Sequence, residues 1–346
     1  MEKKHNPSID ILKFLAVLLV VNSHSAALYP ESCRALATGG AIGDVLFFFS
    51  SGYTLFLGRM DRFDAWYKRR IRRIYPSVIA VALLASCIWD WSRPLYDVFL
   101  RGGEWFVSCI MIYYVLLYFV RRYAANHLTV VYCLAGCVIL GWYAMFFEPM
   151  RSWLPTDSTL LFAVPSMGVW IYKWNYLKWG MYFPFMLMGA HVGMKESQEG
   201  SADKEVCLVP IVAKLVLSLA AFYGLQLFCL QNESYSALQI LSLLPLLGVC
   251  FYFYRLTETQ VMLRLFAHPF AGRVMSVIGG LCLEIYLVQA FVRTTELNHL
   301  FPLNLLILFI AMVLAAYVCR AIGRFFQQTF SAVDGYRWKE ILSLTK

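Results

Sequence analysis

The sequence predicts an all-α protein that crosses a membrane many times, and three observations lead to this fold class. First, 60% of the 346 residues are hydrophobic and only 15% are charged, whereas soluble chains are about 45–50% apolar and about 25% charged. Second, apolar runs of about 20 residues, the length of a membrane-spanning helix, recur along the whole chain. Third, no stretch between these runs is large enough for a separate soluble domain. We therefore expect one integral domain over residues 1–346, with a short cytoplasmic tail at about 325–346.

Hydropathy places ten transmembrane helices in this bundle. They lie near 9–29, 40–58, 76–93, 104–120, 128–147, 176–194, 206–229, 235–254, 274–292 and 303–319. With the N-terminus inside, the inner segments hold 21 of the 30 lysine and arginine residues. Basic loops are retained in the cytoplasm, so both termini are predicted there. The net charge of +9 then mostly reflects topology, with some attraction for anionic lipid or an anionic cytosolic ligand, and it does not indicate nucleic-acid binding.

The first predicted span, IDILKFLAVLLVVNSHS over 9–25, carries polar groups at both ends. Lys13 and His24 are eleven residues apart, which in a helix separates them by about 20° around the axis and about 16 Å along it. With Asp10, they form one stripe that must face the bundle, because lipid penalises such groups. Alternatively, Lys13 extends to the headgroups, and His24 is a packed or interfacial histidine.

The second span, GGAIGDVLFFFSSGYTLF over 39–56, is rich in small residues that allow helices to approach closely. Ser51 and Gly52 could instead open the backbone locally and present a hydroxyl. Asp44, in the same span, needs a partner or water. These features fit packing and a functional site equally well.

A basic cytoplasmic segment precedes the third span. Its run consists of Lys68, Arg69, Arg70, Arg72 and Arg73. Such a run anchors a membrane protein by its charge. It could also bind a phosphorylated cytosolic ligand, since arginine matches phosphate oxygens with paired hydrogen bonds.

An external segment over 147–179 is rich in tryptophan, including Trp170 and Trp174. It is either an interfacial aromatic belt or a platform for the apolar face of a sugar. The ten cysteines and six histidines show no spacing typical of metal ligands, so we predict no metal site.

Five segments in this order resemble the membrane-bound acyltransferase 3 family over nearly the whole length. They are IDILKFLAVLLVVNSH, GDVLFFFSSGYTLF, YKRRIRRIYP, EWFVSCIMIYY and CLEIYLVQ. Members of this family transfer acyl groups from a cytosolic thioester to acceptors at or beyond the outer face. The resemblance therefore implies acyl-CoA as the donor.

The resemblance also implies roles for individual residues. His24 matches the catalytic histidine, and Lys13 stands where the family has arginine, which keeps the charge and loses the planar fork. The arginines of 68–73 match a motif suggested to contact the phosphates of coenzyme A. Many members have a histidine where this chain has Gln289, so Glu284 or Tyr286 would have to contribute instead.

We therefore expect transfer of an acyl group, acetyl in the first instance, from acetyl-CoA to a hydroxyl of a cell-surface glycan or its lipid-linked precursor. His24 would act as general base or as acyl carrier. Ser51, Asn22 or Tyr53 would stabilise the oxyanion. Candidates for substrate contacts are Asp10, Asp44, Tyr53, Trp105, Trp170, Trp174, Glu284, Tyr286 and Gln289. The sequence is also compatible with a different function.

The alternative is a transporter of a small organic acid or amino acid that uses the same polar path. Either protein would lie in the plasma (inner) membrane of a bacterium, among its lipids, in an oligomeric state that the sequence does not indicate.

Overall fold

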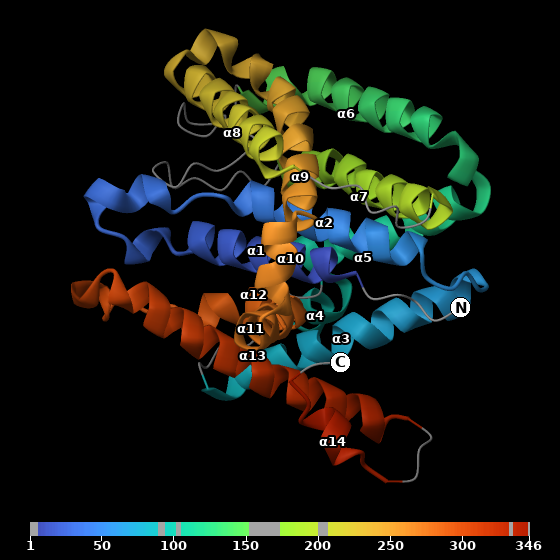
Figure 1. Cartoon of the computed structure of the whole chain (residues 1–346), viewed down its shortest axis with the longest axis vertical. Coiled ribbons are helices and arrows are strands. Elements are labelled where there is room, and N and C mark those ends of the chain that lie inside the picture. The colour runs from blue at the N-terminus through green and yellow to red at the C-terminus, as the bar shows by residue number, and fades with distance from the viewer. Residues whose placement is uncertain are drawn as a thin grey trace.

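The computed structural model describes residues 6–88, 94–101, 105–151, 174–199, 207–331 and 335–344, and these residues form helices and connections with no strand. The helices form one bundle (Figure 1). Their bounds are α1 Pro7–His24, α2 Gly40–Phe56, α3 Phe63–Ile88, α4 Leu95–Arg101, α5 Trp105–Tyr123, α6 Leu128–Arg151, α7 Trp174–Glu199, α8 Leu208–Gln231, α9 Leu243–Thr257, α10 Gln260–Ala267, α11 Pro269–Gly280, α12 Cys282–Val292, α13 Leu303–Thr329 and α14 Trp338–Ile341.

The predicted all-α, polytopic fold is confirmed. Eight helical segments of the described chain are long and apolar enough to cross a membrane, and a ninth forms if α10 and α11, bent by 96°, make one span. Ten spans were predicted, and within the described residues eight or nine meet this measure. The predicted span 274–292 is divided at Leu281 into α11 and α12, and α7 covers 176–194 without being among the eight.

Two boundaries differ from the prediction in ways that matter for function. α3 begins at Phe63 and contains the basic run 68–73, which was predicted to lie in a connection. α13 continues to Thr329, so the tail begins later than predicted. Charged residues extend both helices beyond their apolar parts, because these ends continue into water, where hydropathy no longer detects a helix.

Glycines bring α1, α2 and α7 into close contact. A Cβ on Gly43 of α2 would lie 2.5 Å from Val20 of α1, and one on Gly40 would lie 2.5 Å from Ser23. A Cβ on Gly52 would lie 1.9 Å from the carbonyl oxygen of Met186 in α7. The sequence 39–56 therefore uses its glycines for packing. Because Gly40 lies opposite Ser23 and Gly43 opposite Val20, α1 and α2 are antiparallel.

α1 lies at the centre of the bundle, in contact with α2, α9, α10, α11 and α12. We use two positions along α1 to define two levels of the molecule. Lys13 lies level with the second half of α2, and His24 lies level with the start of α2, near Gly40. We call these the inner and outer levels, following the predicted orientation.

Candidate active site

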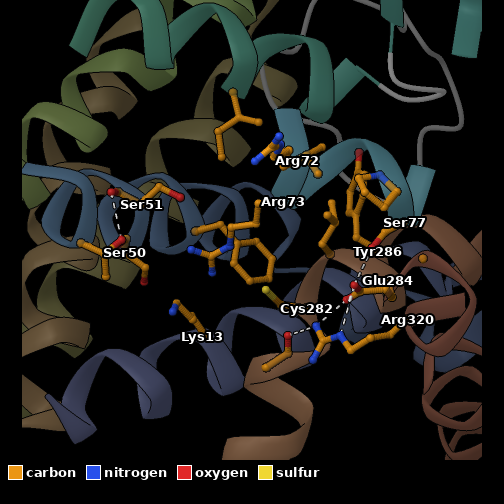
Figure 2. Close-up of a pocket in the computed structure, with 18 of the residues that line it drawn as sticks. Lys13, Ser50, Ser51, Arg72, Arg73, Ser77, Cys282, Glu284, Tyr286 and Arg320 are labelled. Atoms are coloured by element: carbon orange, nitrogen blue, oxygen red, sulfur yellow. Dashed lines mark hydrogen bonds and ion pairs between the residues drawn. The ribbon is translucent and has the colours of Figure 1, made fainter. Parts of the chain in front are cut away.

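A cavity of about 600 Å³ lies between α1, α2, α3, α5, α12 and α13 (Figure 2). Six basic side chains contribute to its wall: Lys13, Arg69, Arg72, Arg73, Arg320 and Arg324. Among the described residues, Glu284 is the only acidic one in this wall. The wall also contains Phe47, Phe106, Tyr114 and Tyr286. The cavity thus combines excess positive charge with an aromatic part.

The basic part of the wall comes from α3 and α13. Arg69 forms an ion pair with Asp61, and hydrogen bonds from this arginine lower the pKa of the Asp61 carboxyl. Arg72, Arg73 and Arg324 have no carboxylate partner among the residues that the structure describes. Three arginine charges therefore remain available to an anion.

The predicted basic run divides into two groups. Arg69, Arg72 and Arg73 line the cavity, whereas Lys68 is exposed and does not. Arg70 points elsewhere, with its guanidinium 4.1 Å from the ring centroid of the buried Trp66. Helical spacing separates them, because consecutive residues of α3 face different directions.

Lys13 reaches the cavity from α1, and Ser51 reaches it from α2. Figure 2 shows both side chains facing the same space as Arg73. The Lys13 ammonium lies 4.0 Å from the Asp10 carboxylate, a distance that leaves it able to bind a second anion. Asp10 itself is half-buried and does not line the cavity.

A buried ion pair forms the opposite wall. The guanidinium of Arg320 donates to both carboxylate oxygens of Glu284, at 2.7 and 3.2 Å, and Ser77 donates to the same carboxylate at 2.7 Å (Figure 2). Arg320 also donates to the carbonyl oxygen of Gly280, at the end of α11. The sequence analysis missed Arg320 and Ser77. An arginine following an apolar span was the available signal, since charge within a bundle requires a partner.

His24 is the last residue of α1. Its Nδ1 lies 2.8 Å from the carbonyl oxygen of Val20. A carbonyl can only accept, so Nδ1 carries the hydrogen, and in the neutral ring Nε2 holds the lone pair. The ring meets Tyr286 edge-on, with centroids 6.4 Å apart. Tyr286 lines the cavity, so this tyrosine connects the cavity wall with the catalytic candidate.

Arg293, directly after α12, connects the end of α1 with Gln289 of α12. Arg293 donates to the backbone carbonyl of His24, and its Nε donates to the carbonyl of Gln289 at 3.0 Å. The spacing of Tyr286, Gln289 and Arg293 places all three on one face of the helix. Gln289 is buried, and its Oε1 has no hydrogen-bond partner among the described residues. The sequence analysis missed Arg293, which satisfies a carbonyl at the end of α1.

The predicted oxyanion donors are not brought to His24. Both amide hydrogens of Asn22 are used, by the carbonyls of Leu36 at 2.8 Å and Thr38 at 3.0 Å. Tyr53 donates to Glu196 at 2.7 Å and accepts from Asn6 at 2.8 Å, at the inner end of α1. Ser51 lies at the level of Lys13, about 16 Å along α1 from His24.

Among the other predicted residues, Asp44 and Trp105 do not line the cavity. Asp44 is buried in α2, and Trp105 stacks on Tyr182 with ring centroids 5.8 Å apart. Trp170 lies outside the described residues, and so does the side chain of Trp174. Within the described ranges, no group of three or more His, Cys, Asp or Glu residues could hold a metal ion.

The comparison with protein families gives one result that covers most of the chain. A family model described as an acyltransferase domain matches residues 6–323. Compared with curated proteins and with solved structures, the chain gives no match. The family match contains the cavity-lining residues of α1, α2, α3, α5 and α12, together with His24. The chain therefore belongs to the acyltransferase 3 family.

Proposed function

We propose that this membrane acyltransferase moves an acetyl group from cytosolic acetyl-CoA to a hydroxyl of a cell-surface glycan or its lipid-linked precursor, in the plasma membrane of a bacterium. The observation that carries the proposal is the arrangement of one cavity. Arginines without carboxylate partners form its inner part, and Tyr286, in contact with His24, forms its other part.

The inner part suits the nucleotide end of the donor. Coenzyme A carries phosphates, and arginine binds phosphate oxygens through paired, charge-assisted hydrogen bonds. Arg72, Arg73 and Arg324 present this chemistry. Lys13 adds a charge deeper along α1, and the thin pantetheine arm would extend past it toward Tyr286.

The tautomer of His24 supports Nε2 as the reacting atom. As a general base, Nε2 takes the proton of the acceptor hydroxyl while the oxygen forms a bond to the thioester carbon. The carbon–sulfur bond then breaks, and the thiolate of coenzyme A leaves and takes up a proton. A general base contributes about 10²–10⁴-fold in rate. Nε2 could equally attack the thioester first and carry the acyl group, and both routes need the same lone pair.

The acceptor would approach His24 from the outer side, beside α12. Gln289 offers a buried amide oxygen there without a partner among the described residues. A sugar presents several hydroxyls, so one can react while a second donates to Gln289. The proposed aromatic platform over 147–179 lies largely outside the described residues and stays a prediction.

A labelled-donor assay tests the proposal. Purified protein receives radiolabelled acetyl-CoA and a panel of glycan acceptors, and both free coenzyme A and labelled product are measured. We expect acceptor-dependent transfer that His24→Ala abolishes. His191→Ala is the matched control, because His191 is exposed on α7. If the native protein neither binds nor consumes acetyl-CoA, while vesicles containing it accumulate an organic acid or amino acid, the protein is a transporter.

A further inference from the structure

The C-terminal segment 335–344 folds back onto the inner end of α13. Arg324 donates through Nη1 to two of its backbone carbonyls, those of Glu340 at 2.9 Å and Ser343 at 2.5 Å. Ile341, in the short helix α14, is buried. A segment held in this way has a fixed position relative to Arg324.

Further contacts attach the same segment along α13. Tyr317 donates to the carbonyl of Leu342 at 2.9 Å, and the backbone N–H of Arg337 donates to the side chain of Gln328 at 2.8 Å. Phe325 stacks on Tyr336, with ring centroids 4.9 Å apart. These contacts extend over three turns of α13, so segment 335–344 is packed against the inner end of this helix.

Arg324 also belongs to the wall of the cavity. Gly323 brings α13 against Pro76 of α3, where a Cβ would lie 3.1 Å from the backbone, and Arg324 lines the same cavity as Arg72 and Arg73 of α3. Two N–H groups of Arg324 serve the segment. The other three of its five donors have no partner among the described residues.

Carbonyl partners orient a guanidinium without neutralising it. A carboxylate in the same place would cancel the charge that an anion requires. Arg324 and the segment 335–344 also lie beyond residue 323, where the family match ends.

We propose that segment 335–344 is part of the donor site: it holds Arg324 so that its Nε and Nη2 bind a phosphate of the nucleotide end of acyl-CoA. This inference rests on the proposed function. Arg324 contacts the ligand, and segment 335–344 acts through it as a positioning element. The same phosphate chemistry occurs in lipid headgroups, so the test must separate the two sources.

The test is donor affinity in lipid nanodiscs, measured by titration with acetyl-CoA and with acetyl-phosphopantetheine, which lacks the nucleotide. The variants are a chain ending at Ser331, Arg324→Gln, Tyr317→Phe and the combination of Arg324→Gln with the shortened chain. Arg264→Gln is the matched control, because this exposed side chain on α10 does not line the cavity. Discs of neutral lipid and discs containing phosphatidylglycerol are compared.

We expect the shortened chain and Arg324→Gln each to weaken acetyl-CoA binding about tenfold, the range for one hydrogen-bonded charge, in both kinds of disc. Tyr317→Phe should weaken it by a smaller factor, and the combined variant should lose no more than either alone. Acetyl-phosphopantetheine affinity and the control should not change.

Three results would overturn the inference. Unchanged acetyl-CoA affinity in the shortened chain, or equal losses for both ligands, would show that the segment has no role toward the nucleotide. An effect confined to discs containing phosphatidylglycerol would assign Arg324 to lipid headgroups. If the native protein binds no acetyl-CoA in either disc, the proposed function itself fails, which the first three outcomes do not imply.

Discussion

The inner and outer levels of the site differ in charge and in how their polar groups are satisfied. At the inner level, Arg72, Arg73 and Arg324 line the cavity without carboxylate partners among the described residues. At the outer level, His24 is fixed through Nδ1 by Val20 and through its carbonyl by Arg293. One level is open to an anion, and the other orients a single titratable ring.

This difference indicates a division of labour. Under the proposed function, the excess charge of the inner level attracts the charged nucleotide of the donor. A proton transfer requires a ring in one orientation and one tautomer, because the reacting nitrogen must reach the hydroxyl. The buried ion pair of Glu284 and Arg320 serves neither of these two functions directly. It holds α12 against α13.

The largest effect should come from breaking that buried pair. Glu284→Gln leaves the Arg320 charge without its carboxylate, and removing one partner of a buried pair costs about 3–5 kcal/mol. Thermal or denaturant unfolding in detergent measures the loss. Replacing both residues by methionine should recover much of the stability, since the unpaired charge is then absent. A single variant as stable as the native protein would show that the pair is solvated and structurally dispensable.

The next effect concerns the inner charges. Arg73→Gln should weaken acetyl-CoA binding about tenfold, because a hydrogen bond to a charged group contributes about 1.5–3 kcal/mol. Arg70→Gln should change it far less, since Arg70 packs on Trp66 outside the cavity. Titrations at low and high salt should show the difference shrinking as salt screens the charges. If both variants lose the same amount of acetyl-CoA affinity, the donor does not bind in the cavity that Arg73 lines and Arg70 does not.

At the outer level, Gln289→Met should lower transfer to the glycan acceptor about three- to tenfold. It removes one hydrogen bond, worth about 0.5–1.5 kcal/mol, while keeping the length of the side chain. The Kd for acetyl-CoA should not change, because Gln289 does not line the cavity. If Gln289→Met weakens acetyl-CoA binding instead, Gln289 acts on the donor at the inner level, and its assignment to the acceptor is wrong.

The smallest effect should come from Lys13→Arg, which keeps the charge that the family resemblance expects there. Donor affinity should stay within about threefold of the native value, whereas Lys13→Gln should weaken it further, because Coulomb attraction to the donor is lost. Donor titration of both variants measures this. Complete loss of binding in Lys13→Arg would mean that the shape of the ammonium, and not its charge, is required.

The sequence predicted the membrane class, the α-helical fold and the positions of most helices, because hydropathy follows directly from composition. It also placed Lys13 and His24 on one helix at two levels. It could not foresee which residues of the run 68–73 face the cavity, since this depends on the rotation of α3 against α13.

Partners distant in sequence were likewise beyond prediction. Arg320 and Glu284 are 36 positions apart in the sequence, and Arg293 and His24 are 269 positions apart. Each is a lone arginine near the end of an apolar run. The preference of basic residues for the ends of membrane spans already explains an arginine there, so the sequence gives no sign of a partner. Asn22 and Tyr53 were predicted as site residues because they are polar, and the structure shows that they donate hydrogen bonds to the carbonyl of Leu36 and to Glu196.

The most direct test of the account uses sealed proteoliposomes with uniform orientation. Labelled acetyl-CoA is supplied on the side of the basic cavity and a glycan acceptor on the opposite side, for the native protein and for His24→Ala. The account predicts label on the acceptor across the membrane, with coenzyme A released on the donor side, and neither in the variant. Equal transfer by the variant, or transfer only when donor and acceptor share one side, would contradict the claim that the two levels join donor and acceptor through His24.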